Sequence, residues 1–192
     1  MSDSSSYNWR PETLVSERLI IRAIAEGDAA SVFAYASNPN VTRFTLWDYH
    51  KSLEETMEFL KHGIGSYVEK APDPMAICMQ EHPDVVIGLI GCRWAMRKNQ
   101  CMEMGYAIGE PHWGRGIAVE AGRAVIDYAF GKFEVERIQA HTMAENSAST
   151  RVLEKLGMVK EGTARSALLH RGRFWDLHYF SILRGEWIAK AP

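Results

Sequence analysis

The chain has 192 residues, of which 46% are hydrophobic, and this size suits one globular domain with a sizeable core. Its 22 basic and 24 acidic residues are well mixed, so the sequence offers no basic patch for nucleic-acid binding. The three cysteines, Cys78, Cys92 and Cys101, have no CxxC spacing, which argues against a disulfide framework or a zinc site and favours a reducing compartment.

Residues 1–16 are polar and rich in serine, and they predict a flexible N-terminal arm. They lack the apolar core of a signal peptide, and no apolar run in the chain approaches the length of a membrane span. We therefore expect a soluble, cytoplasmic protein that does not bind membranes. The domain itself is expected over residues 17–192.

In the first half of the chain, residues 16–24 predict a strand and residues 26–37 a short helix capped by Asp28. Residues 41–52 are rich in aromatics without a clear period, which is typical of a loop. Ser52 and Glu55 have the spacing of a helix capping box. Behind them, apolar residues at helical spacing predict a buried stripe, formed by Leu53, Met57, Leu60, Ile64 and Tyr67. Residues 74–80 and 85–95 predict a hairpin of two strands.

From residue 102 to residue 108, bulky side chains alternate with small ones, as in a strand with one packed face. Glu103 is the one carboxylate on the face with small residues. Residues 136–143 predict a further strand, which should run parallel to 102–108 because a helix lies between the two. Asn146 is placed to cap the next helix, and Gly157 is placed to end it.

A glycine loop joins the 102–108 strand to its helix: Gly114 and Gly116 bracket Arg115, and helical spacing begins at Ile117. Such a loop presents backbone N–H groups and the positive end of a helix dipole, a combination that binds anions and most often phosphate. An ordinary tight turn is the alternative interpretation. A dinucleotide-binding GxGxxG motif fails at Val119, and the GK[ST] sequence of a P-loop is absent.

The six residues 113–118, WGRGIA, resemble motif A of the GNAT superfamily of N-acetyltransferases, [RQ]xxGx[GA], with Trp113 in place of the usual Arg or Gln. With the VEA that follows, they are similar to the RimJ/RimL-like branch, which includes ribosomal-protein-alanine acetyltransferases. The segment after Asn146 resembles the GNAT signature NxxAxxxYxKLGF, with Ser149, Leu153 and Met158 at its Ala, Tyr and Phe positions. Residues 159–187 resemble the closing hairpin of the same branch.

The resemblance implies the GNAT fold, an α/β (α+β) architecture with a mixed, mostly antiparallel sheet of about seven strands and helices on both faces. It implies an acetyl-CoA-dependent N-acetyltransferase without a metal, which transfers acetyl directly to a primary amine of a protein N-terminus or small molecule. A non-catalytic acyl-CoA-binding or sensing module and a nucleotide-binding regulatory domain are the alternatives. The acceptor, the acyl length, the general base and the oligomeric state, including a homodimer, stay open.

The resemblance also assigns residues to the site. The expected acetyl-CoA contacts are Tyr106, Ile108, Trp113, Gly114, Arg115, Gly116, Ile117, Ala118, Asn146 and Ser149. Ser149 is the candidate proton donor to the thiolate, because Leu153 replaces the tyrosine that often serves there. Glu103 is the candidate base, with an ordinary ion pair as its alternative, and His141 is a second candidate base. Candidate acceptor contacts are Trp47, Asp48 and Tyr49, with covering of the core as the alternative role of Trp47 and Tyr49.

Overall fold

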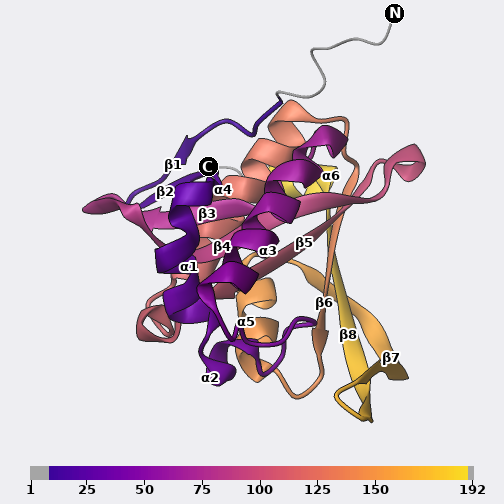
Figure 1. The fold of residues 1–192 in the computed structure, drawn as a ribbon. Helices are drawn as coiled ribbons and strands as arrows, with labels where there is room; N and C mark the ends of the chain where they lie inside the picture. The colour runs from indigo at the N-terminus through magenta and orange to yellow at the C-terminus, as the bar shows by residue number, and fades with distance from the viewer. Residues whose placement is uncertain (1–8, 190–192) are drawn as a thin grey trace, which may run out of the picture.

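The computed structural model describes residues 9–189, which form a mixed sheet covered by helices (Figure 1). The sheet has eight strands in the order β1-β2-β3-β4-β5-β6-β8-β7. Their bounds are β1 (Leu14–Val15), β2 (Leu19–Ala23), β3 (Met75–Met79), β4 (His82–Met96), β5 (Cys101–Ile108), β6 (Arg137–Met143), β7 (Val159–His170) and β8 (Arg173–Leu183). Neighbouring strands are antiparallel except for β5 and β6, which are parallel as predicted.

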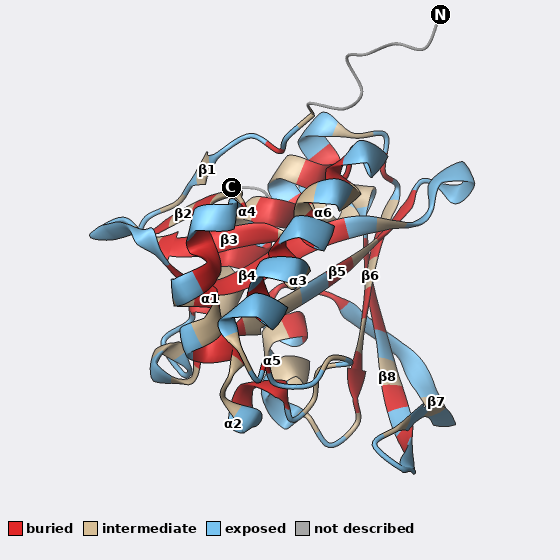
Figure 2. Cartoon of the chain, in the orientation of Figure 1, coloured by how far each residue is buried: buried red, intermediate tan, exposed pale blue. Residues whose placement is uncertain are grey.

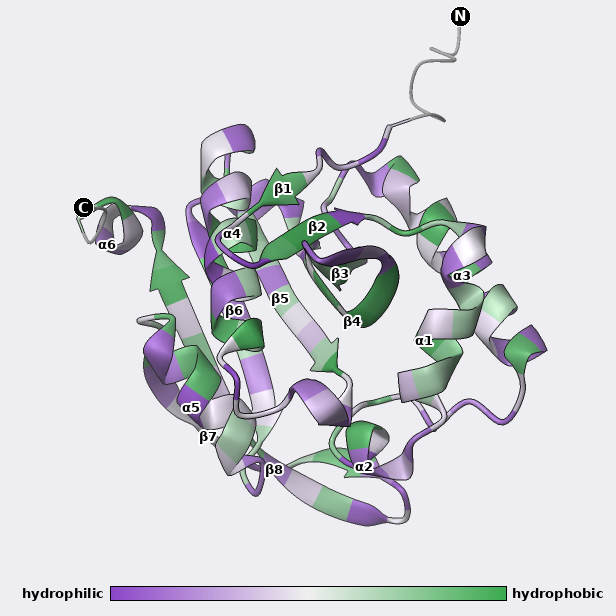
Figure 3. Ribbon diagram, turned by 90° about the vertical axis from the view of Figure 1, so that its left-hand side faces the viewer, coloured by the Kyte–Doolittle hydropathy of each residue, from purple (hydrophilic) through white to green (hydrophobic). Residues whose placement is uncertain are grey.

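The helices lie on both faces of the sheet, which confirms the predicted fold class. Their bounds are α1 (Ala29–Ala36), α2 (Pro39–Thr42), α3 (Leu53–Ser66), α4 (Ile117–Lys132), α5 (Ser147–Lys155) and α6 (Arg184–Ile188). Figure 3 shows α1 and α3 on one side of the central strands and α4 on the other. Each side has its own apolar core, one with α1 and α3 and one with α4 and α5.

The central strands supply both cores, because successive side chains of a strand point to opposite faces. On β4, Leu89 packs toward α1 and α3, whereas Ile90 packs toward α4. On β5, Met102 and Met104 also pack toward α4, so Glu103 between them faces the α1 and α3 side. Figure 2 shows the buried residues gathered in these strands and in the helix faces against them.

The predicted N-terminal arm is described only from residue 9, and residues 1–8 lie outside the described range. In the described part, the Trp9 ring packs edge-on against Tyr67 and Phe133, with centroids 6.3 and 6.2 Å apart. The backbone N–H of Glu12 donates to the Tyr128 hydroxyl at 3.2 Å. Strand β1 pairs with β2 and is the eighth strand, where the sequence predicted about seven.

Helix α3 and the turn after it bury only part of the predicted apolar stripe. Leu60 and Tyr67 are buried as expected, but Leu53 and Met57 are 40% and 39% exposed. The buried face passes through Gly63, where an added Cβ would lie 2.8 Å from Ile24 and 2.9 Å from a Pro74 carbon. The helix approaches the 71–74 segment closely at this glycine, and that contact sets its rotation. The stripe was therefore wrong for Leu53 and Met57.

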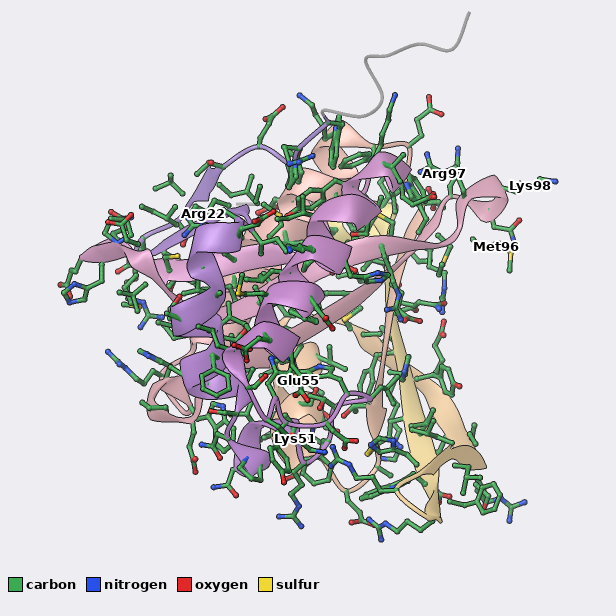
Figure 4. All side chains as sticks on the ribbon, in the orientation of Figure 1. Arg22, Lys51, Glu55, Met96, Arg97 and Lys98 are labelled. Atoms are coloured by element: carbon green, nitrogen blue, oxygen red, sulfur yellow. The ribbon has the colours of Figure 1, made fainter. Side chains whose placement is uncertain are left out.

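The two predicted N-caps of this half form only in part. At the start of α3, the Ser52 hydroxyl accepts from the N–H of Glu55 at 3.3 Å, as predicted. The return bond of the capping box is missing, because the Glu55 carboxylate accepts from the N–H of Lys51 and not from that of Ser52 (Lys51 and Glu55 are labelled in Figure 4). Asp28 does not cap α1 with its side chain. Its carboxylate instead accepts two hydrogen bonds from the Arg22 guanidinium, because an ion pair is available across the turn.

Strands β5 and β6 stay paired over only three residues each, Cys101 to Glu103 against Arg137 to Gln139. Beyond Glu103 the two strands diverge (Figure 1). The remaining part of β5 stays paired with β4 on its other edge, up to Ile108. This divergence opens the middle of the sheet, next to the glycine loop and to Glu103.

Candidate functional site

A cavity of about 1250 Å³ lies at the divergence of β5 from β6. Its wall includes the glycine loop and the start of α5 on one side, and parts of α3, β4 and the 43–50 loop on the other. Pockets for one small ligand are typically about 300 to 1,000 Å³, so this space is large enough for two substrates. Within residues 9–189, no group of three or more His, Cys, Asp and Glu side chains is arranged to hold a metal ion.

The glycine loop enters α4 with backbone angles that suit glycine. Gly114 has φ = 72° and Gly116 has φ = 78°, a region that costs other residues about 1 to 2 kcal/mol. Gly116 is the N-cap of α4 and offers no side chain to the N–H groups of the first turn. The Trp113 indole N–H closes the loop by donating to the Ile108 carbonyl at 2.7 Å. The first turn of α4 is thus open toward the cavity.

Arg18 holds this loop from the far end of the chain. Its guanidinium donates to the Arg115 carbonyl at 3.1 Å and to the Glu120 carboxylate at 2.7 Å. Glu120 also accepts from the backbone N–H of Arg18 and the hydroxyl of Ser16, each at 2.8 Å. These contacts leave the Glu120 side chain only 16% exposed. No local sequence pattern could predict the contact between Arg18 and Glu120, because 102 positions separate them in the chain.

Tyr106 and Ser149 form a pair of hydroxyls in the cavity wall, 2.7 Å apart. Asn146 caps α5 as predicted: its side-chain oxygen accepts from the N–H of Ser149 at 3.1 Å. Burial raises the pKa of Tyr106 to about 12, so its hydroxyl stays protonated near neutral pH. Leu153, which stands where GNAT proteins often have tyrosine, is buried in the core.

Seven of the eight remaining predicted acetyl-CoA contacts line the same cavity as this pair. The cavity wall includes Ile108, Trp113, Gly114, Gly116, Ile117, Ala118 and Asn146. Arg115 is exposed and is not part of this wall, and only its carbonyl takes part in the loop, by accepting from Arg18. The structure thus brings together nine of the ten residues that the resemblance assigned to acetyl-CoA.

Glu103 lies in the wall and is held by three side chains. Its carboxylate forms an ion pair with Arg93, accepts from the Gln139 amide at 3.2 Å and lies 3.5 Å from the His141 ring nitrogen. The contact with His141 is the largest cause that lowers the pKa of Glu103 to about 2; the Gln139 amide and the Arg93 charge lower it further, and burial opposes the shift. Glu103 is therefore a fixed negative charge at neutral pH and a weak base. His141, the second candidate base, is its partner.

The three predicted acceptor contacts lie in different surroundings. The Trp47 ring lies 5.4 Å from His50 and 6.3 Å from Phe59, and all three rings line the cavity. Asp48 instead forms an ion pair with Arg171 of the β7–β8 turn at 2.9 Å, with its side chain 76% exposed. Tyr49 is 42% exposed and, like Asp48, is not among the lining residues. The structure brings only Trp47 of these three to the cavity.

A family model, curated relatives and solved structures all match this chain to the same family. The model of the acetyltransferase (GNAT) domain matches residues 18–159. An uncharacterized N-acetyltransferase, p20 of Bacillus licheniformis, is 32% identical over 176 residues, which cover 92% of this chain and 98% of that protein. A GNAT-family acetyltransferase from Bacillus anthracis superposes with a TM-score of 0.82 at 27% identity, covering 91% of this chain and 100% of its own.

The fold is also shared with RimL, a ribosomal L7/L12 alpha-N-protein acetyltransferase solved in complex with coenzyme A. That structure covers 90% of this chain and 98% of its own, with a TM-score of 0.81 at 20% identity. In addition, every helix within residues 9–189 is too short or too polar to cross a bilayer. The family model, the relatives and the diverging sheet agree with the resemblance seen in the sequence. The chain therefore belongs to the GNAT family and is an N-acetyltransferase.

Proposed function

We propose that this protein transfers acetyl from acetyl-CoA directly to a primary amine while both substrates are bound. One observation carries the proposal: a single cavity joins the glycine loop at the start of α4, the Tyr106–Ser149 hydroxyl pair and the carboxylate-bearing face of β5. The first two face the α4 and α5 side, and Glu103 faces the α1 and α3 side. Donor and acceptor can thus approach each other around β5.

On the donor side, the N–H groups of the 113–118 loop would bind the CoA pyrophosphate, with the α4 dipole adding to the attraction. RimL, bound to CoA in its solved structure, supports this choice of donor. The exposed edge of β5 beyond Glu103 offers further backbone groups to the pantetheine arm. The Tyr106–Ser149 pair would then stand at the thioester end and donate to the sulfur as it leaves.

On the acceptor side, the fixed charge of Glu103 would attract an ammonium group, and the rings of Trp47, His50 and Phe59 would cover its apolar part. This chemistry suits the N-terminus of a protein or a small alkyl amine. The reaction of RimL, at the alpha-amine of a ribosomal protein, supports including peptides among the acceptors.

A panel of amines tests the proposed function. We expect free CoA thiol to appear only when acetyl-CoA is incubated with an acceptor, and the panel should include peptides that begin with Ala or Ser, polyamines and small aromatic amines. Mass spectrometry should show one added acetyl group on the amine nitrogen. An acyl-CoA-binding module without catalysis would bind CoA and release no thiol above the rate without protein.

Replacing all three cysteines by alanine should leave the transfer rate unchanged. Cys78, Cys92 and Cys101 are buried, and burial raises the pKa of each thiol, so none is a ready nucleophile. Initial rates with both substrates varied should give the intersecting lines of a ternary complex. Parallel lines, or an acetyl-cysteine trapped by mass spectrometry, would contradict direct transfer.

A further inference from the structure

A second carboxylate, Asp73, lines the acceptor side of the cavity. It belongs to the segment that precedes β3 and lies flat on β4. An added Cβ at Gly91 would lie only 2.6 Å from both the Asp73 Cα and the Pro72 carbonyl oxygen. That carbonyl accepts from the N–H of Cys92 at 3.0 Å. Asp73 can occupy this place because β4 has no side chain at residue 91.

The register of the sheet sets Asp73 beside Glu103. Gly91 faces Gly105 across β4 and β5, and the next pair on the same face is Arg93 with Glu103. A Cβ at Gly105 would meet nothing within 4 Å, so this part of the cavity floor is open. Gly105 thus forms a bare floor on the α1 and α3 side of the sheet, with Asp73 seated over its cross-strand partner Gly91 and Glu103 two residues away on β5.

The two carboxylates have opposite surroundings. Glu103 has three partners, whereas no hydrogen bond between described residues reaches the Asp73 carboxylate. Ser66 fixes only the backbone of Asp73, by donating to its carbonyl at 3.0 Å. Burial raises the pKa of Asp73 to about 6, with Glu103 adding to the rise and Arg93 opposing it. Two carboxylates whose environments separate their pKa values commonly divide the roles of base and fixed charge.

We propose that Asp73 is the base of the reaction, which takes the proton of the acceptor ammonium over the open floor at Gly105 while Glu103 binds that ammonium by its charge. This assignment rests on the proposed function. It also names the acceptor as a primary amine that enters as a cation, since a neutral amine would need neither carboxylate. A buried carboxylate that can exchange a proton near neutral pH suits this step better than one that stays ionised.

The step balances in protons and electrons. The ammonium gives one proton to the Asp73 carboxylate, and the freed lone pair attacks the thioester carbon to form the C–N bond. The oxyanion collapses and breaks the C–S bond, and the thiolate takes the second amine proton by way of the Tyr106–Ser149 pair. The products are the N-acetyl amide and CoA thiol, and Asp73 returns its proton to solvent.

The pH dependence of Asp73→Asn tests the assignment. For the wild type, kcat/KM should fall as the pH drops through about 6, where Asp73 becomes protonated. At pH 7 the variant should lose roughly 10²- to 10⁴-fold in kcat/KM, the usual contribution of a positioned base. Its residual rate should rise only as the acceptor deprotonates by itself, near about pH 8 for a peptide N-terminus. Glu103→Gln should mainly raise the KM for the acceptor, and its kcat/KM should still fall as the pH drops through about 6.

Folding and binding controls separate this role from a structural one. Because burial penalises the ionised Asp73, Asp73→Asn should melt at or above the wild-type temperature at pH 8, and CoA should stabilise both proteins equally. Asp84→Asn, an exposed position on β4 outside the cavity wall, is the matched control and should behave as wild type.

Three outcomes would overturn the assignment. The first is a kcat/KM of Asp73→Asn within threefold of the wild type, and the second is an Asp73→Asn variant whose kcat/KM still falls below about pH 6 as in the wild type. The third is a Glu103→Gln variant that loses this fall while Asp73→Asn keeps it. A wild-type protein that acetylates no amine in the panel would reject the proposed function first, before any variant is measured. The two failures are therefore distinguishable.

Discussion

Gly116→Asp should abolish the thermal stabilisation of this protein by CoA. At about 100 times its dissociation constant, a ligand stabilises a folded protein by about 2.7 kcal/mol, or roughly 5 to 10 °C for a chain of this size. Gly116 is the N-cap of α4 and lines the cavity, so an aspartate there would place a negative charge against the pyrophosphate. Two like charges about 4 Å apart near a protein surface repel by about 4 kcal/mol, which corresponds to about a thousandfold in affinity.

Two further variants separate charge from backbone strain. Gly116→Asn has the same shape without the charge and tolerates φ = 78°, so it should keep measurable CoA binding. Gly131→Asp places the same charge on an exposed part of α4 with open space around it, and it should bind CoA as the wild type does. Differential scanning fluorimetry with and without CoA measures all three. Undiminished stabilisation of Gly116→Asp would show that CoA does not bind at this loop.

Ser149→Ala should slow the transfer step on the order of a hundredfold if its hydroxyl protonates the leaving thiolate. Tyr106 can donate to Ser149 over the 2.7 Å between them, which leaves the serine proton free for the sulfur. Loss of a single hydrogen bond to sulfur would cost only about 0.5 to 1.5 kcal/mol, or roughly threefold to tenfold. The size of the effect therefore separates a proton donor from a group that merely solvates the thiolate.

Single-turnover rates with saturating acetyl-CoA and a confirmed acceptor provide the measurement, because they exclude product release. Tyr106→Phe should show a smaller loss, since Ser149 keeps its own proton. Ser147→Ala, at the exposed start of the same helix, is the matched control and should react at the wild-type rate. A wild-type rate for Ser149→Ala would remove this residue from the mechanism and leave Tyr106 or water as the donor.

The sequence determined those features that depend on residues close together in the chain. Alternation along residues 102–108 predicted β5 and its packed face, and two glycines at the helix start predicted the loop that lines the cavity. The cap at Asn146 and the parallel course of β6 were also readable, because capping needs a side chain at one position and a helix between strands forces a crossover.

Tertiary structure decided how these pieces face one another. The contact of Arg18 with Glu120 joins residues 102 positions apart, and periodicity carries no information on such a pairing. The rotation of α3 follows from its approach at Gly63, a residue that no hydrophobic pattern marks as buried. For the same reason, Leu53 and Met57 were assigned to the wrong face.

The carboxylates show the difference most clearly. Glu103 was visible in the sequence as the one charge on a face of small residues, but its three partners, and thus its low pKa, come from β4 and β6. Asp73 lies in a loop with no motif, and it reaches the cavity only because its segment packs over Gly91. The free energy of an ionised group depends on its neighbours in space and its distance from water. The sequence alone therefore determined which groups are present, and the fold decided which of them can exchange a proton.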